Sequence, residues 1–347
     1  MTMIRQRDDG GVSERPPRIA GSVGELVAGA TRRTAVNPGD ARSGSTFEEI
    51  ELDGRRYFLK CLGHHSDWIM RVTGDRDVRT FRIWQAGIMD QAPACIDHAV
   101  VGMAVEGEGD DATLAVLMRD VGAGLVPEGD AVIPLRQHRR FVDHLAELSA
   151  AFWGWEDRLG LCSMAERLRF FAPDNIAGEL AREDVSPTLI AARDGWASLA
   201  ERSPQLASLA ATVHAEPDLL VGPLAETPST FLHGDWKMGN LGSHPDGRTI
   251  LIDWAYPGAG PPCWDLAWYL ALNRARLPES KESTTREFRN ALERRGIATD
   301  GWYERQLVLC LFGMAVTFGW EKALGDDEEL RWWESAAMEG AQRVGLR

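Results

Sequence analysis

Residues 231–242 read FLHGDWKMGNLG, and residues 249–254 read TILIDW. Asp235, Asn240 and Asp253 in these stretches are five and then thirteen positions apart, and the stretches begin with short apolar runs typical of strands. Phosphoryl transfer from a nucleotide needs one group that orients the acceptor hydroxyl and two oxygen donors that hold Mg²⁺. Carboxylate and amide oxygens suit Mg²⁺, so the pattern predicts a magnesium-dependent phosphoryl-transfer site.

Protein kinases carry the same three groups at this spacing, as the catalytic-loop Asp and Asn and the Asp of the DFG motif. The His-Gly-Asp and Ile-Asp-Trp motifs resemble those of the aminoglycoside phosphotransferase and choline kinase family of small-molecule kinases. Further matching segments follow in order from about residue 43 to residue 272. The resemblance implies an α+β, protein-kinase-like two-lobed fold, with a β-rich N-lobe, a mainly helical C-lobe, and ATP and Mg²⁺ bound in the cleft.

The resemblance also implies roles for the residues of the motif. Asp235 is expected to act as the catalytic base, mainly by orienting the acceptor hydroxyl, with Asn240 and Asp253 as the Mg²⁺ ligands. Lys237 is expected to touch the γ-phosphate and offset its charge, and a solvated lysine is the alternative. His233 is expected to position the loop through hydrogen bonds.

Asp265 stands in the run Trp-Asp-Leu-Ala and matches the Asp that follows the metal-binding segment in the family. We expect it to brace the catalytic loop. The connection over residues 257–262 is too short for a regulatory activation loop, and no Ala-Pro-Glu follows it. The sequence therefore predicts an activity that phosphorylation does not control.

Lys60 ends the run Tyr-Phe-Leu-Lys, and in this family a lysine on that strand holds the α- and β-phosphates. Its partner is expected to be an acid on the following helix. No Glu occurs between Glu51 and Glu106, so Asp77 is the first candidate and Asp75 the second. Both side chains are shorter than the usual Glu.

Two further nucleotide-binding segments are predicted from their place in the chain. A Gly-Ser-rich loop is expected to cover the phosphates with its backbone N–H groups and hydroxyls, through Ser43, Gly44 and Ser45. The end of the run VLMRDV is expected to form the hinge between the lobes, where backbone groups read adenine. The hinge contacts are expected to be Met118, Asp120 and Val121.

Strand and helix signals divide the chain into three parts. These are a flexible segment at 1–18, an N-lobe at 19–121 with its hinge near 118–121, and a C-lobe at 122–347 with the catalytic loop at 231–242 and the metal-binding segment at 250–254. Strands are predicted at 46–52, 56–61, 99–105, 113–118, 230–232 and 249–252. Helices are predicted at 23–30, 75–87, 138–155, 165–171, 189–200, 263–273, 283–295, 302–324 and 327–343.

The 347 residues carry a formal net charge of −14, which argues against nucleic-acid binding because that needs a basic face. The five cysteines are widely spaced and include no Cys-x-x-Cys pair, which favours a reducing compartment. The N-terminus has no apolar signal core, and the longest apolar run, around 307–320, is shorter than a membrane span. We therefore expect a cytoplasmic protein with a small-molecule acceptor and no nucleic-acid or membrane partner.

The acceptor is expected to be an aminoglycoside, another amino sugar or an amino alcohol. The acids at 326–329 and Glu334 are candidates to face a polycation, with a solvated helix start as the alternative. A kinase of the same fold for a neutral sugar, a macrolide or choline is a second possibility, because the acceptor pocket varies within a fold. A catalytically inactive nucleotide-binding module is a third, against which the complete set of motif residues argues. The sequence leaves the oligomeric state open.

Overall fold

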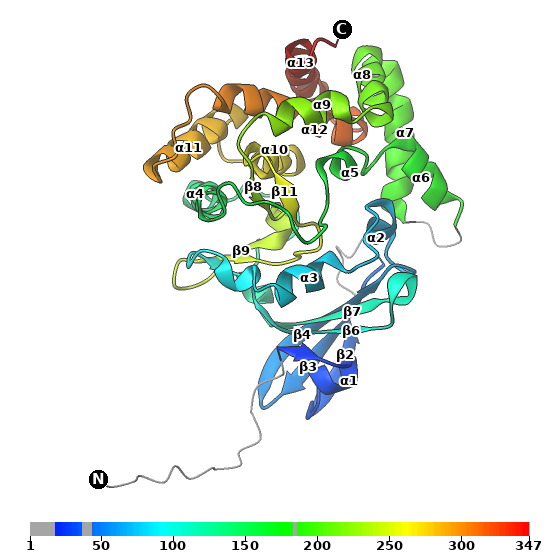
Figure 1. The fold of residues 1–347 in the computed structure, drawn as a ribbon, viewed down its shortest axis with the longest axis vertical. Coiled ribbons are helices and arrows are strands. Elements are labelled where there is room, and N and C mark those ends of the chain that lie inside the picture. The colour runs from blue at the N-terminus through cyan, green and yellow to red at the C-terminus, as the bar shows by residue number, and fades with distance from the viewer. Residues whose placement is uncertain (1–17, 37–43, 183–185, 347) are drawn as a thin grey trace.

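The computed structural model describes residues 18–36, 44–182 and 186–346. The flexible segment predicted at 1–18 therefore lies almost wholly outside the described residues. Figure 1 shows a sheet-based N-lobe below and a mainly helical C-lobe above. This is the two-lobed α+β fold that the sequence predicts.

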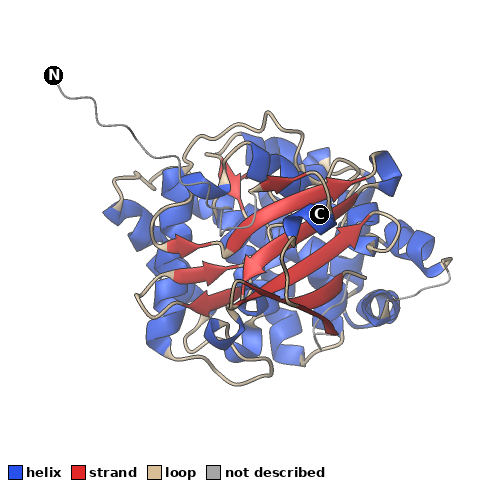
Figure 2. Ribbon diagram, turned by 90° about the horizontal axis from the view of Figure 1, so that it is seen from below, coloured by secondary structure: helices blue, strands red, loops and turns tan. Residues whose placement is uncertain are grey.

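The N-lobe is built on a six-stranded sheet in the order β1-β6-β7-β4-β3-β2, which Figure 2 shows from below. Only the β1–β6 pair in this sheet is parallel. Asp53 and Gly54 link β3 to β4 with φ of 51° and 68°, which is the conformation that a tight hairpin turn needs. The strands are β1 (Ile19–Ala20), β2 (Arg32–Val36), β3 (Thr46–Leu52), β4 (Arg55–Gly63), β6 (Val100–Glu106) and β7 (Thr113–Arg119).

Each face of this sheet contributes to an apolar core, and alternate residues of a strand point to opposite faces. On one face Ile50, Leu59 and Leu117 form a small core with Leu26 of α1 (Val23–Leu26). The other face joins the main core of the molecule, to which Ile83 of α3 (Arg79–Gln85) belongs. A further short helix, α2 (Trp68–Val72), lies between β4 and α3 in the chain.

The C-lobe is organised around α12 (Tyr303–Ala323), which is buried on nearly every side. It packs against α7, α8, α10 and α13, which explains why its sequence is apolar all round. Within the described residues, no helix combines the length and apolar character needed to cross a membrane. The other helices are α4 (Leu135–Ala151), α5 (Met164–Leu168), α6 (Pro173–Leu180), α7 (Pro187–Arg202), α8 (Pro204–Ala215), α9 (Asp218–Ala225), α10 (Cys263–Leu272), α11 (Lys281–Arg294) and α13 (Asp327–Arg343).

Two small sheets hold the ends of the motif loops. β8 (Thr230–Leu232) pairs with β11 (Gly258–Gly260), and β10 (Thr249–Leu251) lies between β5 (Ile96–Asp97) and β9 (Leu241–Ser243). The catalytic loop therefore runs from β8 to β9, and the metal-binding segment runs from β10 to β11. Single 3₁₀ turns occur at Met89–Gln91, Gly109–Asp111, Gly122–Gly124, Met238–Asn240 and Arg274–Arg276.

Several elements differ from their predicted bounds for identifiable reasons. The helix predicted at 75–87 begins only at Arg79, because Gly74 and Val78 have φ of 64° and 53°, which no right-handed helix accommodates. The elements β1, β5, β9 and β11 escaped prediction because two or three residues show no alternation. Also missed were β2, α2, α6, α8 and α9.

Candidate active site

The carboxylate of Asp235 is held on both of its oxygens. Oδ1 accepts a hydrogen bond from the indole Nε1–H of Trp268 at 2.8 Å. Oδ2 accepts a hydrogen bond from Asn240 Nδ2 at 2.8 Å and forms an ion pair with Lys237 Nζ at 2.8 Å. The structure thus brings three of the predicted site residues together and adds Trp268 of α10 to them.

The two expected metal ligands, Asn240 and Asp253, lie on neighbouring backbone segments. The N–H of Ile252 donates to the backbone carbonyl of Asn240 at 3.0 Å, which ties the metal-binding segment to the catalytic loop. The side-chain Nδ2 of Asn240 donates to the backbone and the carboxylate of Asp235. The amide oxygen Oδ1 of Asn240 is therefore the atom of this side chain that suits a cation.

Asp253 combines an unusual backbone conformation with a partly buried charge. Its φ of 61° lies in the left-handed region, which few residues with a Cβ adopt and which clusters at functional sites. Its Oδ1 accepts a hydrogen bond from Lys60 Nζ at 2.8 Å. Burial disfavours both charges, yet each partner holds the other ionised. The pKa of Asp253 lies below its ordinary value and the pKa of Lys60 lies above its own.

The partner predicted for Lys60 is wrong. Asp77 forms an ion pair with Arg82 at 2.7 Å on a largely exposed site, and the Asp75 carboxylate accepts the backbone N–H of Arg79 at 2.9 Å. Both acids precede the start of α3 rather than standing on it. Helix α3 therefore offers Lys60 no carboxylate, and Asp253 of the C-lobe forms the ion pair with Lys60 instead.

Ser45 and Gly44 of the predicted phosphate loop are anchored to the start of α2, while Ser43 lies outside the described residues. Gly44 has φ of 96°, and a Cβ there would lie 2.0 Å from the carbonyl oxygen of Ser66. Ser45 Oγ donates to Asp67 at 3.3 Å. The Asp67 carboxylate also caps α2, and its negative charge helps to raise the pKa of Lys60.

The predicted hinge is a continuation of β7. Met118 pairs with β4 and β6 and is buried, and the Asp120 carboxylate binds the exposed Arg56 at 3.1 Å. The carbonyl of Val121 accepts the N–H of Gly124. The N–H of Val126 then donates to the carbonyl of Leu241 in β9. The segment thus passes beside the catalytic loop, while its adenine contacts stay a prediction.

Asp265 at the start of α10 bonds to the backbone of the catalytic loop. Its carboxylate accepts the N–H of His233 at 2.9 Å and the N–H of Gly234 at 3.0 Å, which are the contacts that a bracing role requires. Burial raises the pKa of Asp265 to about 6. Burial also lowers the pKa of His233 to about 4, so this imidazole is neutral near pH 7 and accepts the N–H of Asp235 at 3.3 Å.

A close backbone approach explains the glycine of the His-Gly-Asp motif. Gly234 has φ of 85°, and a Cβ there would lie 1.8 Å from the carbonyl oxygen of Tyr256. The same carbonyl accepts a hydrogen bond from Arg167 at 2.8 Å. Arg167 is fully buried, with its guanidinium 4.5 Å from the centre of the Tyr256 ring. No sequence signal marked this arginine.

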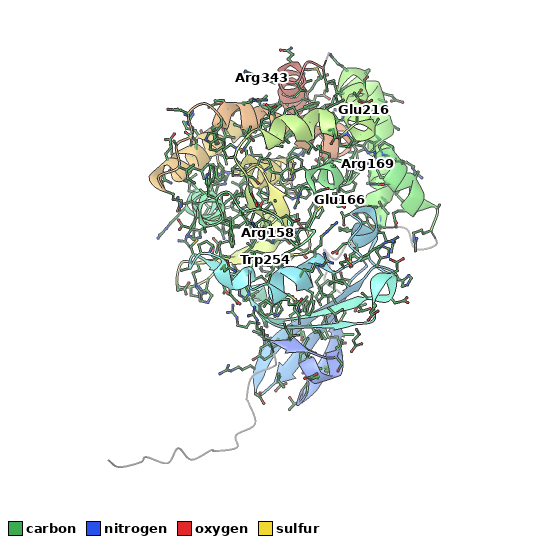
Figure 3. The ribbon with its side chains drawn as sticks, viewed as in Figure 1. Arg158, Glu166, Arg169, Glu216, Trp254 and Arg343 are labelled. Atoms are coloured by element: carbon green, nitrogen blue, oxygen red, sulfur yellow. The ribbon has the colours of Figure 1, made fainter. Side chains whose placement is uncertain are left out.

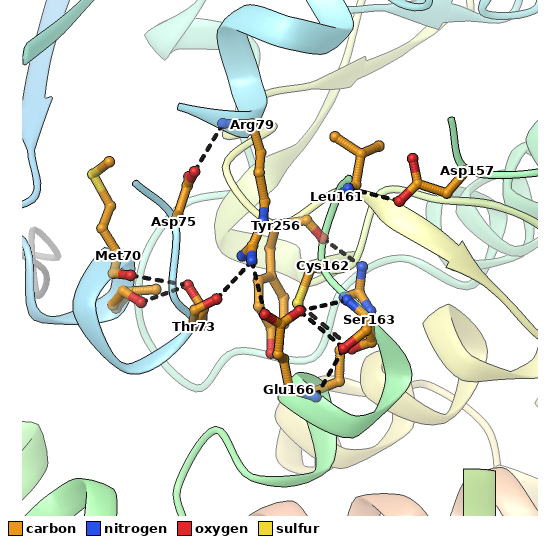
Figure 4. A network of polar contacts seen from close by, with 12 residues as sticks. Met70, Thr73, Asp75, Arg79, Asp157, Leu161, Cys162, Ser163, Glu166 and Tyr256 are labelled. Atoms are coloured by element: carbon orange, nitrogen blue, oxygen red, sulfur yellow. Dashed lines mark hydrogen bonds and ion pairs between the residues drawn. The ribbon is translucent and has the colours of Figure 1, made fainter. Parts of the chain in front are cut away.

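Further contacts fix the N-lobe to the C-lobe beside the site. Figure 4 shows Arg79 of α3 donating to the carbonyl of Thr73 at 2.6 Å and to Glu166 of α5 at 3.2 Å. Thr80 Oγ1 donates to the carbonyl of Trp254 at 3.1 Å. Figure 3 labels Trp254 and Glu166 where the two lobes meet. Helix α3 is therefore fastened to the metal-binding segment.

Most of the acids considered for a polycationic acceptor are engaged within the C-lobe. They belong to α13 and its N-cap, and Figure 1 shows α13 at the end of the C-lobe away from the N-lobe. Four of the five carboxylates contact other side chains of the C-lobe, and this location gives no support to a polycation site there. The pairs are Asp326 with Arg274, Asp327 with Arg202, Glu329 with Lys281, and Glu334 with Ser203.

The model of a phosphotransferase enzyme family, APH, matches residues 85–307, and no curated protein matches the chain. A microcompartment-associated aminopropanol kinase is 15% identical, with 92% of this chain and 94% of that chain covered at a TM-score of 0.51. The choline kinase LicA from Streptococcus pneumoniae is 12% identical, with 91% and 94% covered at 0.47. The aminoglycoside phosphotransferase APH(4)-Ia is 14% identical, with 94% and 97% covered at 0.48.

The family match spans well over half of the chain and contains the catalytic loop, the metal-binding segment and α10. The similarity to the aminopropanol kinase extends over both lobes and supports the fold. The chain therefore belongs to the phosphotransferase enzyme family and is a small-molecule phosphotransferase with a protein-kinase-like fold.

Proposed function

We propose that the protein transfers the γ-phosphoryl group of ATP, with Mg²⁺, to a hydroxyl group of a small molecule. The observation that carries the proposal is one connected set of contacts. Asp235 bonds to Asn240, the Asn240 backbone bonds to Ile252, and the adjacent Asp253 bonds to Lys60. This set places a candidate base, two oxygen ligands and a cation side by side, which is the equipment that phosphoryl transfer needs.

The side chains of the catalytic loop would orient the acceptor and offset charge. Asp235 Oδ1 uses one lone pair for Trp268, and the acceptor hydroxyl would donate to the other. Holding the hydroxyl in line with the phosphorus atom lowers the barrier more than early proton removal does. Lys237 carries positive charge beside Asp235, and Lys60 carries it beside Asp253. Both would offset the negative charge of the phosphates.

The residues fit a Mg²⁺ ion that binds together with a nucleotide. Among the residues described in the structure, no cluster of three or more His, Cys, Asp or Glu side chains is arranged to hold a metal by itself. Mg²⁺ in nucleotide sites usually takes one or two protein oxygens plus phosphate and water. Asn240 and the ionised Asp253 supply two such oxygens. When bound, Mg²⁺ would neutralise charge on the transferring phosphoryl group.

The remaining parts of the nucleotide site follow from the same assignment. We place the lobe boundary near residues 118–121, with Met118, Asp120 and Val121 beside adenine. Gly44 and Ser45 would lie over the phosphates, and Ser43, outside the described residues, would continue that loop. The five cysteines are free thiols in the structure, which fits the proposed cytoplasmic location.

The acceptor class that we propose is an amino alcohol, an amino sugar or an aminoglycoside. The net charge of −14 favours a cationic acceptor over an anionic one. An aminopropanol kinase shares the fold, and the acids of α13 are engaged within the C-lobe. Small amino alcohols therefore come first in an acceptor panel, ahead of polycationic aminoglycosides.

The test is ATP turnover measured by a coupled ADP assay with and without Mg²⁺. The acceptors are aminopropanol, ethanolamine, choline, glucosamine, a neutral sugar, kanamycin and a macrolide. We expect one class to be strongly preferred, turnover to stop with EDTA, and Asp235→Asn to reduce kcat by about 10²- to 10⁴-fold. Turnover that Asp235→Asn leaves unchanged would contradict the assignment. ATP binding without turnover of any acceptor would favour an inactive binding module instead.

A further inference from the structure

We propose that Trp268, on helix α10, is a positioning residue for the catalytic carboxylate. The inference rests on the proposed function, because it concerns how Asp235 is aimed at the acceptor. Three residues of one helix contact successive parts of the loop. Asp265 at the start of the helix bonds to the backbone of His233 and Gly234. Trp268 in the middle bonds to the Asp235 side chain. Asn273 at the C-cap bonds to the Met238 backbone.

Packing holds the Trp268 ring in place, so that its indole N–H points in a fixed direction. Its side chain is 2% exposed. The ring packs against Tyr256, at 5.8 Å between centroids, and against Phe318, at 4.9 Å edge-on, with Phe170 at 6.4 Å. Close packing of this kind holds a buried side chain near one rotamer. Its Nε1–H donates to Asp235 Oδ1 and has no acceptor function, so Trp268 can orient the carboxylate but cannot take a proton from the acceptor.

The carboxylate needs this contact because its other bonds do not fix its plane. A carboxylate rotates broadly about its last side-chain bond, and Asn240 and Lys237 both bind the same oxygen, Oδ2. Under the proposed function, Asn240 also binds the metal and Lys237 also contacts the phosphate. Nucleotide binding would therefore compete with their bonds to Asp235. Trp268 binds the opposite oxygen from the protein core. It therefore keeps Oδ1 in one place when the nucleotide engages the other side.

Asn273 bonds to the backbone of the second half of the catalytic loop, as Asp265 bonds to the backbone of the first half. Its Oδ1 accepts the N–H of Met238 at 3.0 Å, and its Nδ2 donates to the carbonyl of Tyr269 at 2.7 Å. Met238 begins the 3₁₀ turn that ends at Asn240. The buried amide of Asn273 thus sets the position of the proposed metal ligand relative to α10.

The same helix contains a second tryptophan, Trp264, that serves as a control for Trp268. Trp264 lies one turn earlier and is completely buried, yet its indole N–H has no hydrogen-bond partner among the described residues. A buried tryptophan in α10 therefore does not require a carboxylate. Changing each tryptophan to phenylalanine removes a similar amount of ring, but only at position 268 does it remove a bond to the site.

The experiment compares Trp268→Phe with Trp264→Phe, using MgATP and the best acceptor of the panel. We expect Trp268→Phe to lower kcat by about 10- to 100-fold, while the KM for ATP changes by less than about threefold, because the nucleotide contacts are untouched. Trp264→Phe should keep kcat within about threefold. Thermal unfolding should show similar losses for the two variants, since both remove part of a buried ring.

A second readout does not depend on activity. In ¹H–¹⁵N spectra of the full protein with ¹⁵N-labelled tryptophan, the indole signal of Trp268 is the one that Trp268→Phe removes. That signal should shift strongly in Asp235→Ala, whereas the Trp264 signal should not. Equal kinetics for the two phenylalanine variants, or a Trp268 signal indifferent to Asp235→Ala, would overturn the positioning role. Wild-type protein without phosphoryl transfer would overturn the proposed function, and the spectra would still decide whether the contact exists.

Discussion

The two sides of the active site are built in different ways. On the C-lobe side, α10 bonds to the catalytic loop at three places, through Asp265, Trp268 and Asn273. On the N-lobe side, Lys60 reaches across the lobe boundary to Asp253, and α3 carries no acid that could hold it. Under the proposed function, the C-lobe holds the groups that orient the acceptor, whereas the N-lobe contributes a charge that is paired with an acid of the C-lobe.

Removing that charge should lower the catalytic efficiency strongly without unfolding the protein. We expect Lys60→Ala to lower kcat/KM for ATP by about 10²- to 10³-fold, the range found when one preorganised charge-stabilising group is lost from an active site. Asp77→Asn should leave kcat/KM within about threefold, because Asp77 pairs with Arg82 at the surface. Steady-state kinetics at varied ATP measure both, with circular dichroism as the check on folding. A large effect of Asp77→Asn would show that the acid does reach Lys60 in the working enzyme.

A change within the catalytic loop tests the C-lobe side. Gly234→Ala would place a Cβ 1.8 Å from the Tyr256 carbonyl at φ of 85°, so we expect it to lower the free energy of unfolding by at least about 2 kcal/mol and to abolish activity. Gly239→Ala is the control, because the nearest atom to its added Cβ is the end of Lys237 at 3.9 Å. Thermal or urea unfolding measures the difference. Equal stability of the two variants would mean that the loop is less constrained than its contacts indicate.

The smallest expected effect concerns pH and lies away from the site. Burial lowers the pKa of His214 to about 4, below the value near 6.5 of an unfolded histidine. The unfolded chain therefore binds more protons between pH 6.5 and 4, and stability falls as the pH is lowered through that window. His214→Leu should reduce the slope of unfolding free energy against pH by at most about 1.4 kcal/mol per unit, as measured by urea unfolding at pH 5 and 7. An unchanged slope would show that His214 titrates normally.

The sequence predicted more of the C-lobe side than of the N-lobe side. Asp235, Asn240 and Asp253 are close in the chain and flanked by strands, so their spacing alone indicated the site. Asp265 was also identified, and its contacts with the loop backbone are those that its expected role requires. The partner of Lys60 was not predictable in this way, because it depends on where α3 starts, and that is set by the positive φ of Gly74 and Val78.

Other parts of the site carry no local signal at all. Trp268 is one of thirteen tryptophans, and its contact with Asp235 depends on how α10 is rotated against the loop. Arg167 stands in an ordinary amphipathic segment, and only the packing of Tyr256 over its guanidinium shows that it is buried. The acids of α13 were visible in the sequence, but their place at the end of the C-lobe away from the N-lobe follows from the packing of α13 on α12.

Phosphoryl transfer is tested most directly by ³¹P nuclear magnetic resonance of the protein with ATP, Mg²⁺ and the best acceptor. We expect the γ-phosphate signal to be replaced by that of a phosphomonoester of the acceptor, in a one-to-one ratio with ADP. We also expect Asp235→Asn, with its fold intact, to give neither signal on the same timescale. Release of inorganic phosphate without a phosphomonoester, or equal transfer by Asp235→Asn, would contradict the proposed function.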